Sequence, residues 1–323
     1  MITTRPDHQT LLAAVELANR APSSVHDTQP WRWLVGRSSI HLMADRTRHV
    51  PVTDPCGRDL LLSCGAALHH LRTALAALGW ATVVHRVPYD HDTAHDTDHL
   101  AAIEPRPHVP TEDDVALAAA ISRRRTDRRR FRPREIPSEY LDLLVRRAAR
   151  AGAVLVPVTD GTSRWVLTRA LSAVRRQAED SRHRLELSAS TGRSRVRNGG
   201  LDTAKRTFPG GLLVDEVSAE DSGQLLVIAT SREDAVSVLR AGEAASATLL
   251  TATVLGLATC LLSRPLALSD TRTVVRDQVL DGTACPQLIV RAGWAPPAAA
   301  PLPRSPVRRA EDTVDYLPGT RHP

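Results

Sequence analysis

The sequence has little of what marks a secreted or membrane protein. Its four cysteines among 323 residues are widely spaced and include no C-x-x-C pair, which indicates reduced thiols rather than a disulfide framework. No charged-then-apolar leader opens the chain, and no uncharged run reaches the ~20 residues that a membrane-spanning helix requires. We therefore expect a cytoplasmic protein that spans no membrane.

Motifs of several common enzyme classes are also missing. No G-x-G-x-x-G follows a strand-like run, and neither G-x-x-x-x-G-K-[ST] nor G-x-S-x-G occurs. The sequence therefore disfavours dinucleotide-binding domains, P-loop enzymes and α/β-hydrolases. Ser23, Ser24, His26 and Asp27 include the residue types of a hydrolytic triad, but such close neighbours cannot hydrogen-bond in series as a triad does.

Aromatic residues make up only 3% of the chain, so Ala, Leu and Val must fill the core. The hydrophobic content of 42% and the charged content of 24% are those of an ordinary globular protein. The length favours two domains or two fused halves. The net charge of +6 and the pI of about 9.7 would suit nucleic acid or a phosphorylated cofactor. Because the sequence has neither a recognisable reading element nor the aromatics of a stacking surface, we expect no nucleic-acid partner.

The most basic stretch is 122–134, S-R-R-R-T-D-R-R-R-F-R-P-R, which holds eight arginines and a single acid, Asp127. Arg124, Thr126 and Arg128 alternate within it, so forked guanidiniums flank a hydroxyl. Such a set suits the oxygens of a terminal phosphate, each charge-assisted hydrogen bond contributing roughly 1.5–3 kcal/mol. The alternative is a solvated basic turn between two helices.

Periodicity along the rest of the chain predicts a mixture of helices and short strands. Residues 105–110 are rich in proline and predict a linker at the domain boundary, and the tail beyond residue 296 is rich in proline and arginine. The expected helices are 11–19, 60–78, 138–151, 165–187 and 234–255, and the expected strands are 33–36, 40–43, 82–87, 154–158, 224–229 and 287–292.

Three histidines, His91, His95 and His99, recur every fourth residue. On a helix this spacing would place three imidazoles on one face for a metal ion. Asp and Thr between them are poor helix formers, so we interpret the segment as an exposed connector and predict no metal site.

Two apolar helical runs match each other. Gly65 and Gly79 bracket one run, Gly242 and Gly256 bracket the other, and the two pairs are separated by the same number of positions. Small residues inside both runs would let two helices approach closely. We interpret the match as an internal duplication, and predict that the two helices pack together.

Taken together, the arginine stretch, the A-P-S-S-V-H-D-T-Q-P-W loop and the paired glycine helices resemble the flavin-dependent nitroreductases. More narrowly they resemble the Acg-type branch, in which two nitroreductase-like halves are fused in one chain. The resemblance implies an α+β fold with an intramolecular pseudo-dimer, made of a truncated first half over residues 1–110 and a second half over 111–323. It also implies one FMN between the halves, because the phosphate motif and the ring-contacting loop occur once each.

The resemblance assigns cofactor-binding roles residue by residue. The arginine stretch would hold the phosphate, the loop of the first half would lie against the ring, and residues 262–264 would face the flavin N5 side. The implied cofactor-binding residues are Pro22, Ser23, Ser24, His26, Asp27, Gln29, Arg124, Arg125, Thr126, Arg128, Ser263, Arg308 and Arg309. Family loops carry Asn where this chain has Asp27, which keeps an acceptor for the ring N3–H but adds negative charge. Residues 181–213 resemble a lid of this branch.

The function that the resemblance implies is an oxidoreductase that takes hydride from NAD(P)H and passes it, by ping-pong, to a nitro, quinone-like or related acceptor. The flavin carries the chemistry, so we predict no catalytic side chain. A non-catalytic flavin-storage protein is the alternative, and a basic nucleic-acid-binding protein is the less favoured one. Because one chain contains both motifs, we expect a monomer to build the site.

Overall fold

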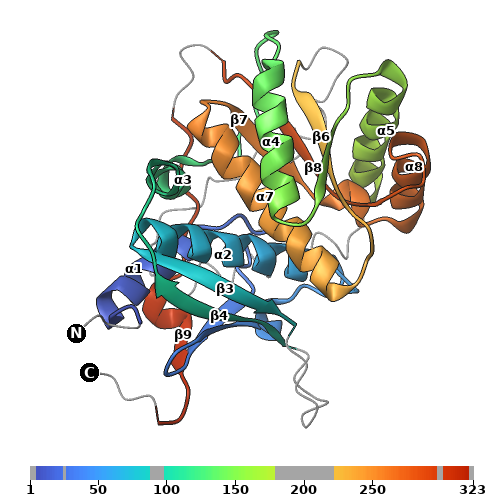
Figure 1. The fold of residues 1–323 in the computed structure, drawn as a ribbon. Helices are drawn as coiled ribbons and strands as arrows, with labels where there is room; N and C mark the ends of the chain where they lie inside the picture. The colour runs from blue at the N-terminus through green and yellow to red at the C-terminus, as the bar shows by residue number, and fades with distance from the viewer. Residues whose placement is uncertain (1–4, 25–26, 88–97, 179–221, 297–300, 320–323) are drawn as a thin grey trace.

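The computed structural model describes residues 5–24, 27–87, 98–178, 222–296 and 301–319. They form two β-sheets with helices packed on them, and two long helices join the sheets at the centre (Figure 1). The expected α+β class is therefore confirmed. No helix among these residues is both long and apolar enough to cross a bilayer.

The first sheet has the strand order β3-β4-β2-β1-β9 and carries helices α1 and α2 over one face. Neighbouring strands are antiparallel except β9, which runs parallel to β1 with Trp33 opposite Val314. Its core includes the fully buried Trp31 and Trp33. The elements are α1 His8–Ala18, β1 Trp31–Val35, β2 Ile40–Ala44, η1 Arg46–Arg48, α2 Arg58–Ala77, β3 Trp80–Arg86, β4 His99–Pro107, η3 Ala310–Asp312 and β9 Val314–Tyr316.

The second sheet has the antiparallel order β5-β6-β8-β7 and is covered on both faces. Helices α4 and α7 pack on one face and α5 and α8 on the other, so β6 is apolar and buried along nearly all of its length. The elements are α3 Glu112–Arg123, α4 Ser138–Arg150, β5 Val154–Pro157, α5 Gly161–Ala178, β6 Gln224–Thr230, α7 Ala235–Val254, β7 Ala258–Leu262, η2 Arg264–Leu266, α8 Ser269–Val279 and β8 Cys285–Gly293.

The two halves meet where α2 crosses α7, and the crossing point is a pair of glycines. A Cβ on Gly65 would lie 2.0 Å from the Leu239 carbonyl oxygen, and one on Gly242 would lie 2.1 Å from that of Leu62. Each glycine thus allows the other helix's backbone to approach closely. The reciprocal contacts confirm that the two repeated helices pack against each other, as predicted.

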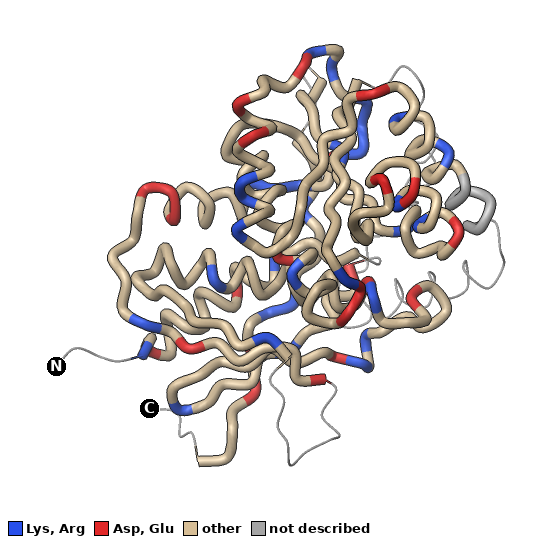
Figure 2. Tube along the Cα trace, turned by 45° about the vertical axis from the view of Figure 1, so that its right-hand side comes forward, with Lys and Arg blue, Asp and Glu red and all other residues tan. Residues whose placement is uncertain are grey.

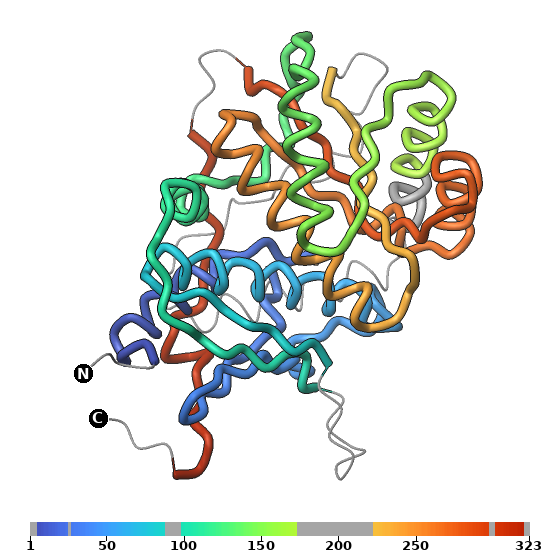
Figure 3. Tube along the Cα trace, viewed as in Figure 1, coloured from blue at the N-terminus to red at the C-terminus, as the bar shows by residue number. Residues whose placement is uncertain are grey.

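The chain's last strand returns to the first sheet (Figure 3). The predicted helices and strands are present with small shifts at their ends, but the sequence pattern missed β4, β7, α8 and β9. The expected linker at 105–110 is partly wrong, because Pro105 and Pro107 belong to β4. Both prolines pair with β3 beyond the part of β4 that pairs with β2, where one missing N–H costs little.

Three predicted features fall wholly or partly outside the described residues. These are the histidines at 91 and 95, residues 181–213 of the expected lid, and the end of the helix expected at 165–187. His99 is described, and its Nε2 lies 3.0 Å from Nδ1 of His41 across the first sheet. The division of the chain at residue 110 stays a prediction.

Candidate functional site

The loop that follows α1 is held by hydroxyl groups. The Ser23 hydroxyl accepts a hydrogen bond from the Gln29 N–H at 3.2 Å, and the Ser63 hydroxyl on α2 accepts one from the Ser24 N–H at 2.9 Å. Asp27 and Gln29 adopt φ values of 52° and 48°, a region that non-glycine residues seldom occupy and that tends to mark functional loops. The described residues of the loop are thus held at Ser23, Ser24 and Gln29, and the Asp27 side chain is exposed.

Gln29 fastens this loop to the C-terminal segment. Its side-chain amide donates to the Pro306 carbonyl at 2.9 Å and accepts from the Arg308 N–H at 3.0 Å. The Arg308 guanidinium donates in turn to the carbonyls of Gln29 and Trp31 and lies 3.5 Å from the Asp45 carboxylate. These contacts make Arg308 a support of the loop; a phosphate contact by Arg308 or Arg309 stays a prediction.

The arginine stretch is a structured loop rather than a solvated turn. Asp127, which is 3% exposed, accepts hydrogen bonds from the Arg129 side chain at 2.9 and 2.7 Å and from its backbone N–H at 3.0 Å. The Asp127 N–H donates to Thr259 on β7 at 2.8 Å. Beneath the loop, the nearly buried Arg291 stacks on Phe131 and donates to the Arg129 carbonyl.

Arg124 stands at the start of this loop as the C-cap of α3, within electrostatic range of Asp27 and His70 of the first half. Its Nε is buried and has no hydrogen-bond partner among the described residues. Burial lowers the pKa of Arg124 to about 10, with Asp27 of the first-half loop acting in the opposite direction. Burial also lowers the pKa of Arg125, helped by the positive charges of Arg304 and Arg20.

Four guanidiniums from three separate segments therefore gather at one place, where their charges repel each other. Such a cluster is stabilised by an anion, and an unpaired buried Nε supplies a donor for it. The sequence motif identified Arg124, and Arg125 was predicted as its neighbour in the arginine stretch. Arg20 and Arg304 carried no motif, and only the fold brings them there.

A second junction joins Ser263, just after β7, to the start of α2. The Ser263 hydroxyl donates to Asp59 Oδ2 at 3.1 Å and lies 3.5 Å from the Ser24 carbonyl oxygen. Asp59 is 2% exposed, and burial raises its pKa to about 6 against the opposing charge of Arg58. Ser263 and Ser24, predicted from different halves of the sequence, are thus brought together.

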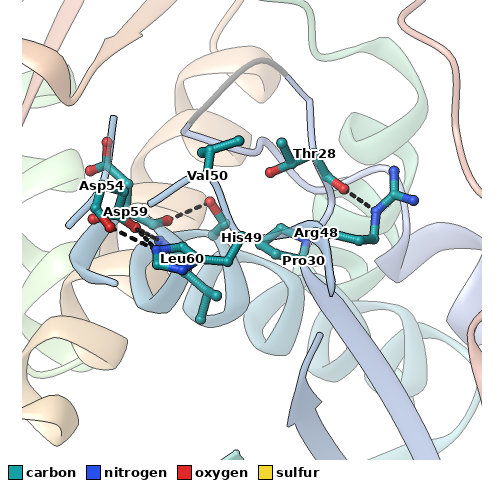
Figure 4. A pocket seen from close by; sticks show the side chains of 9 residues that line it. Thr28, Pro30, Arg48, His49, Val50, Asp54, Asp59 and Leu60 are labelled. Carbon is teal, nitrogen blue, oxygen red and sulfur yellow. Dashed lines mark hydrogen bonds and ion pairs between the residues drawn. The ribbon is translucent and has the colours of Figure 1, made fainter. Parts of the chain in front are cut away.

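A small polar pocket lies beside Asp59 on the side of the first half (Figure 4). Its volume of about 10 Å³ is roughly that of one water molecule. In the close-up, His49 points to Asp54 and Asp59, and Arg48 reaches the Thr28 carbonyl. The lining residues are Thr28, Pro30, Arg48, His49, Val50, Asp54, Asp59, Leu60 and Ser63.

The remaining predicted site residues lie in different surroundings. Pro22 is buried in the loop, Thr126 forms a β-bridge with Thr259, and Arg128 is exposed and hydrogen-bonds the Cys260 thiol. His26 lies outside the described residues. The sequence analysis missed Asp59 and Ser63, because polar residues at the start of a helix have ordinary capping explanations.

Comparison with known proteins identifies relatives that match almost the whole chain. No family model matches the chain. It is 41% identical to "Putative NAD(P)H nitroreductase Rv3131" of Mycobacterium tuberculosis, over 98% of this chain and 94% of that protein. It is 34% identical to "Putative NAD(P)H nitroreductase acg" of the same organism, over 100% of this chain and 98% of that protein. The chain belongs to the Acg-type nitroreductase-like family. The expected family is therefore confirmed over the full length.

Solved nitroreductase structures are more distantly similar to this chain. The FMN-dependent nitroreductase NfnB of Mycobacterium smegmatis, solved with NADPH, is 18% identical, with a TM-score of 0.45 over 62% of this chain and 98% of that one. A nitroreductase of Bacteroides fragilis with bound FMN is 15% identical, with a TM-score of 0.41 over 59% and 94%.

Proposed function

We propose that this protein is an FMN-dependent oxidoreductase that takes hydride from NAD(P)H and reduces a nitro, quinone-like or related acceptor by ping-pong. The observation that carries the proposal is the Arg124 guanidinium. It is partly buried and unpaired at Nε among the described residues, and it lies in a cluster of like charges that faces the first-half loop.

The residues present fit FMN. A terminal phosphate would accept hydrogen bonds from Arg124, Arg125 and Arg128 and from the Thr126 hydroxyl, and would neutralise the cluster. The loop from Pro22 to Gln29 would lie against the ring, and its two left-handed residues would keep that edge rigid. The segment around Ser263 would present its backbone to the ring from the second half.

One FMN per chain is supported by the residue that the first half has at the position equivalent to Ser263 in the repeat. His69 and Ser246 are related by 177 positions and contact each other across the helix crossing. Arg86 lies the same distance before Ser263, at the end of β3. Its guanidinium is held by the fully buried Glu243 at 2.6 and 3.0 Å. At the sequence position equivalent to Ser263, the first half therefore has an arginine paired with the buried Glu243 instead of a serine.

Bound FMN would supply the hydride chemistry, and the chain would bind, orient and shield it. We assign no catalytic side chain. The rigid loop would fix the ring edge, the arginine cluster would fix the phosphate, and the gap between them would set how the ring lies between the halves.

Flavin storage without turnover is a second candidate, favoured by Asp27. Its exposed carboxylate lies within electrostatic range of Arg124, and a negative charge beside the ring would oppose the extra charge of reduced flavin. Binding of nucleic acid is not supported, because basic and acidic residues are interspersed along the described chain in both halves (Figure 2).

The proposal is tested by titrating apo-protein with FMN and then adding NAD(P)H anaerobically. Wild type should bind one FMN, and Arg124→Ala or Arg128→Ala should weaken binding about ten- to a hundredfold, the loss of one charged contact. Arg132→Ala is the matched control, because its exposed side chain lies outside the motif. Wild-type protein that binds no FMN would refute the site. Bound FMN that dithionite reduces and NAD(P)H does not would leave storage as the function.

A further inference from the structure

Asp59 is a buried carboxyl group to which the proposed cofactor chemistry assigns no role. It lies in the first turn of α2 and is connected to the first-half loop through Ser63 and Ser263. Its backbone carbonyl accepts the Ser63 hydroxyl at 2.6 Å, and that hydroxyl accepts the Ser24 N–H at 2.9 Å. Its side chain accepts the Ser263 hydroxyl at 3.1 Å.

The Ser263 hydroxyl has one proton and two acceptors within reach. Asp59 Oδ2 lies at 3.1 Å, and the Ser24 carbonyl oxygen lies at 3.5 Å. An ionised Asp59 takes this proton in a charge-assisted hydrogen bond. A protonated Asp59 instead donates to the Ser263 oxygen, which leaves the serine's own proton to turn to the Ser24 carbonyl.

Asp59 also lines the water-sized pocket, and His49, which lines it too, has Nε2 2.7 Å from the Asp54 carbonyl oxygen. We infer that water in this pocket passes the proton to Asp59. The charged and titratable groups that face Asp59 are Arg58 on its own helix, Arg48, His49 and Asp54 on the preceding segment, and Arg264 after β7.

We propose that Asp59 is a positioning residue for the first-half loop. When Asp59 takes up a proton, the hydrogen-bond chain Ser24–Ser263–Asp59 reverses, and the hydrogen bonding of the loop at the Ser24 carbonyl changes. The proposal rests on the proposed function, because the loop is assigned to the flavin ring. When negative charge arrives at this site, Asp59 takes up a proton from the pocket and Ser263 turns its proton to the Ser24 carbonyl. The proton comes from a solvent hydronium ion through water in the pocket, so one O–H bond forms on Asp59 as one breaks in the donor, and otherwise only these hydrogen bonds change.

Two measurements on full-length apo-protein establish whether Asp59 titrates. Infrared difference spectra of wild type between pH 4 and 8 should show one protonated carboxyl band lost around pH 6, and Asp59→Asn should lack it. Because burial raises this pKa, the stability contributed at low pH is lost as the pH rises through about 6. Asp59→Asn should therefore raise the urea midpoint at pH 8 and leave it unchanged at pH 4. Asp160→Asn, the same change at the exposed N-cap of α5, should give no such gain.

The coupling is read from the visible spectrum of the FMN-loaded protein. The wild-type band should shift with pH through the range in which Asp59 titrates, and the shift should be absent in Asp59→Asn. Ser263→Ala should also lose the shift while keeping the infrared titration, because it breaks the chain but not the carboxyl group.

The outcomes separate this proposal from the proposed function. A flat wild-type flavin spectrum beside a titrating carboxyl band overturns the coupling, and an Asp59 band that does not titrate overturns the switch itself. Wild-type protein that binds no FMN overturns the flavin assignment and the coupling with it, and the apo-protein infrared titration still decides whether Asp59 titrates.

Discussion

Asp127 shapes the arginine loop without facing the proposed phosphate. It holds the Arg129 side chain and backbone, and its own N–H fixes the loop to β7. Asp127→Ala should cost about 1–3 kcal/mol of unfolding free energy, since a buried charge pair is broken but Arg129 is partly exposed. The same variant should weaken FMN binding. Urea unfolding and FMN titration measure the two effects, and a destabilised variant with unchanged FMN affinity would contradict the role in shaping the site.

The buried His70 should make the stability of the folded protein decrease as the pH falls. It is fully buried on α2, and burial, together with the nearby charge of Arg124, holds its pKa well below the ordinary value. A lowered folded-state pKa contributes stability that is present above about pH 6.5 and is lost as the pH falls. Keeping one such histidine neutral costs about 2 kcal/mol at pH 5.

His70→Gln should have a lower free energy of unfolding than wild type at pH 7. Because the wild type loses stability as the pH falls, this difference should shrink by about 2 kcal/mol at pH 5. Urea unfolding of apo-protein at the two pH values measures this difference. An unchanged deficit would mean that His70 is protonated in the folded protein. His108→Gln is the control, because that side chain is partly exposed and lies at the first turn of α3.

Side-chain chemistry decided which single residues the sequence could reveal. Arg124, Thr126 and Gln29 were predicted because their residue types in that order match a motif. Asn19 was missed, although its side chain accepts both buried indole N–H groups and donates to Thr313. Its partners lie on β1 and next to β9, so no local pattern could identify it.

At the scale of elements, the crossing of α2 and α7 depends on two glycines. Gly65→Ala or Gly242→Ala would place a Cβ within 2.0–2.1 Å of a backbone carbonyl oxygen, so the helices must separate. We expect each variant to lose about 3 kcal/mol or more, at the upper end of overpacking. Gly161→Ala, with nothing within 4 Å of the added Cβ, should change stability by no more than about 0.5 kcal/mol. Equal stability of all three variants in urea would show that the crossing tolerates repacking.

Long elements with strong periodicity were predictable, and short ones with distant partners were not. The helices at 60–78 and 234–255 were identified from apolar runs and glycines within each run. By contrast, β9 spans three residues, and its register with β1 joins Trp33 to Val314. Its pairing depends on contacts that only the folded chain creates.

For the whole molecule, the C-terminal end of the predicted second half completes the sheet of the first half. It supplies β9 to the sheet, and the carbonyl of Pro306 and the N–H of Arg308 to Gln29. Removing residues 301–323 should therefore lower both stability and FMN affinity. Loss of stability with unchanged FMN affinity would contradict a role of this segment in holding the loop. Gln29→Ala removes only the side-chain hydrogen bonds of Gln29 with Pro306 and Arg308, and so tests these contacts separately.

A single chain contains both the loop and the arginine cluster, and the helix crossing joins them within one molecule. We therefore expect the flavin to travel with a species of one chain mass, 35.1 kDa, in light scattering with absorbance detection. Mixing unfolded Arg124→Ala and Gln29→Ala chains and refolding them together gives a sharper result. If two chains shared the site, some mixed dimers would combine an intact loop with an intact cluster and recover tight binding. A site within one chain leaves both variants impaired in the mixture, and recovered binding would refute it.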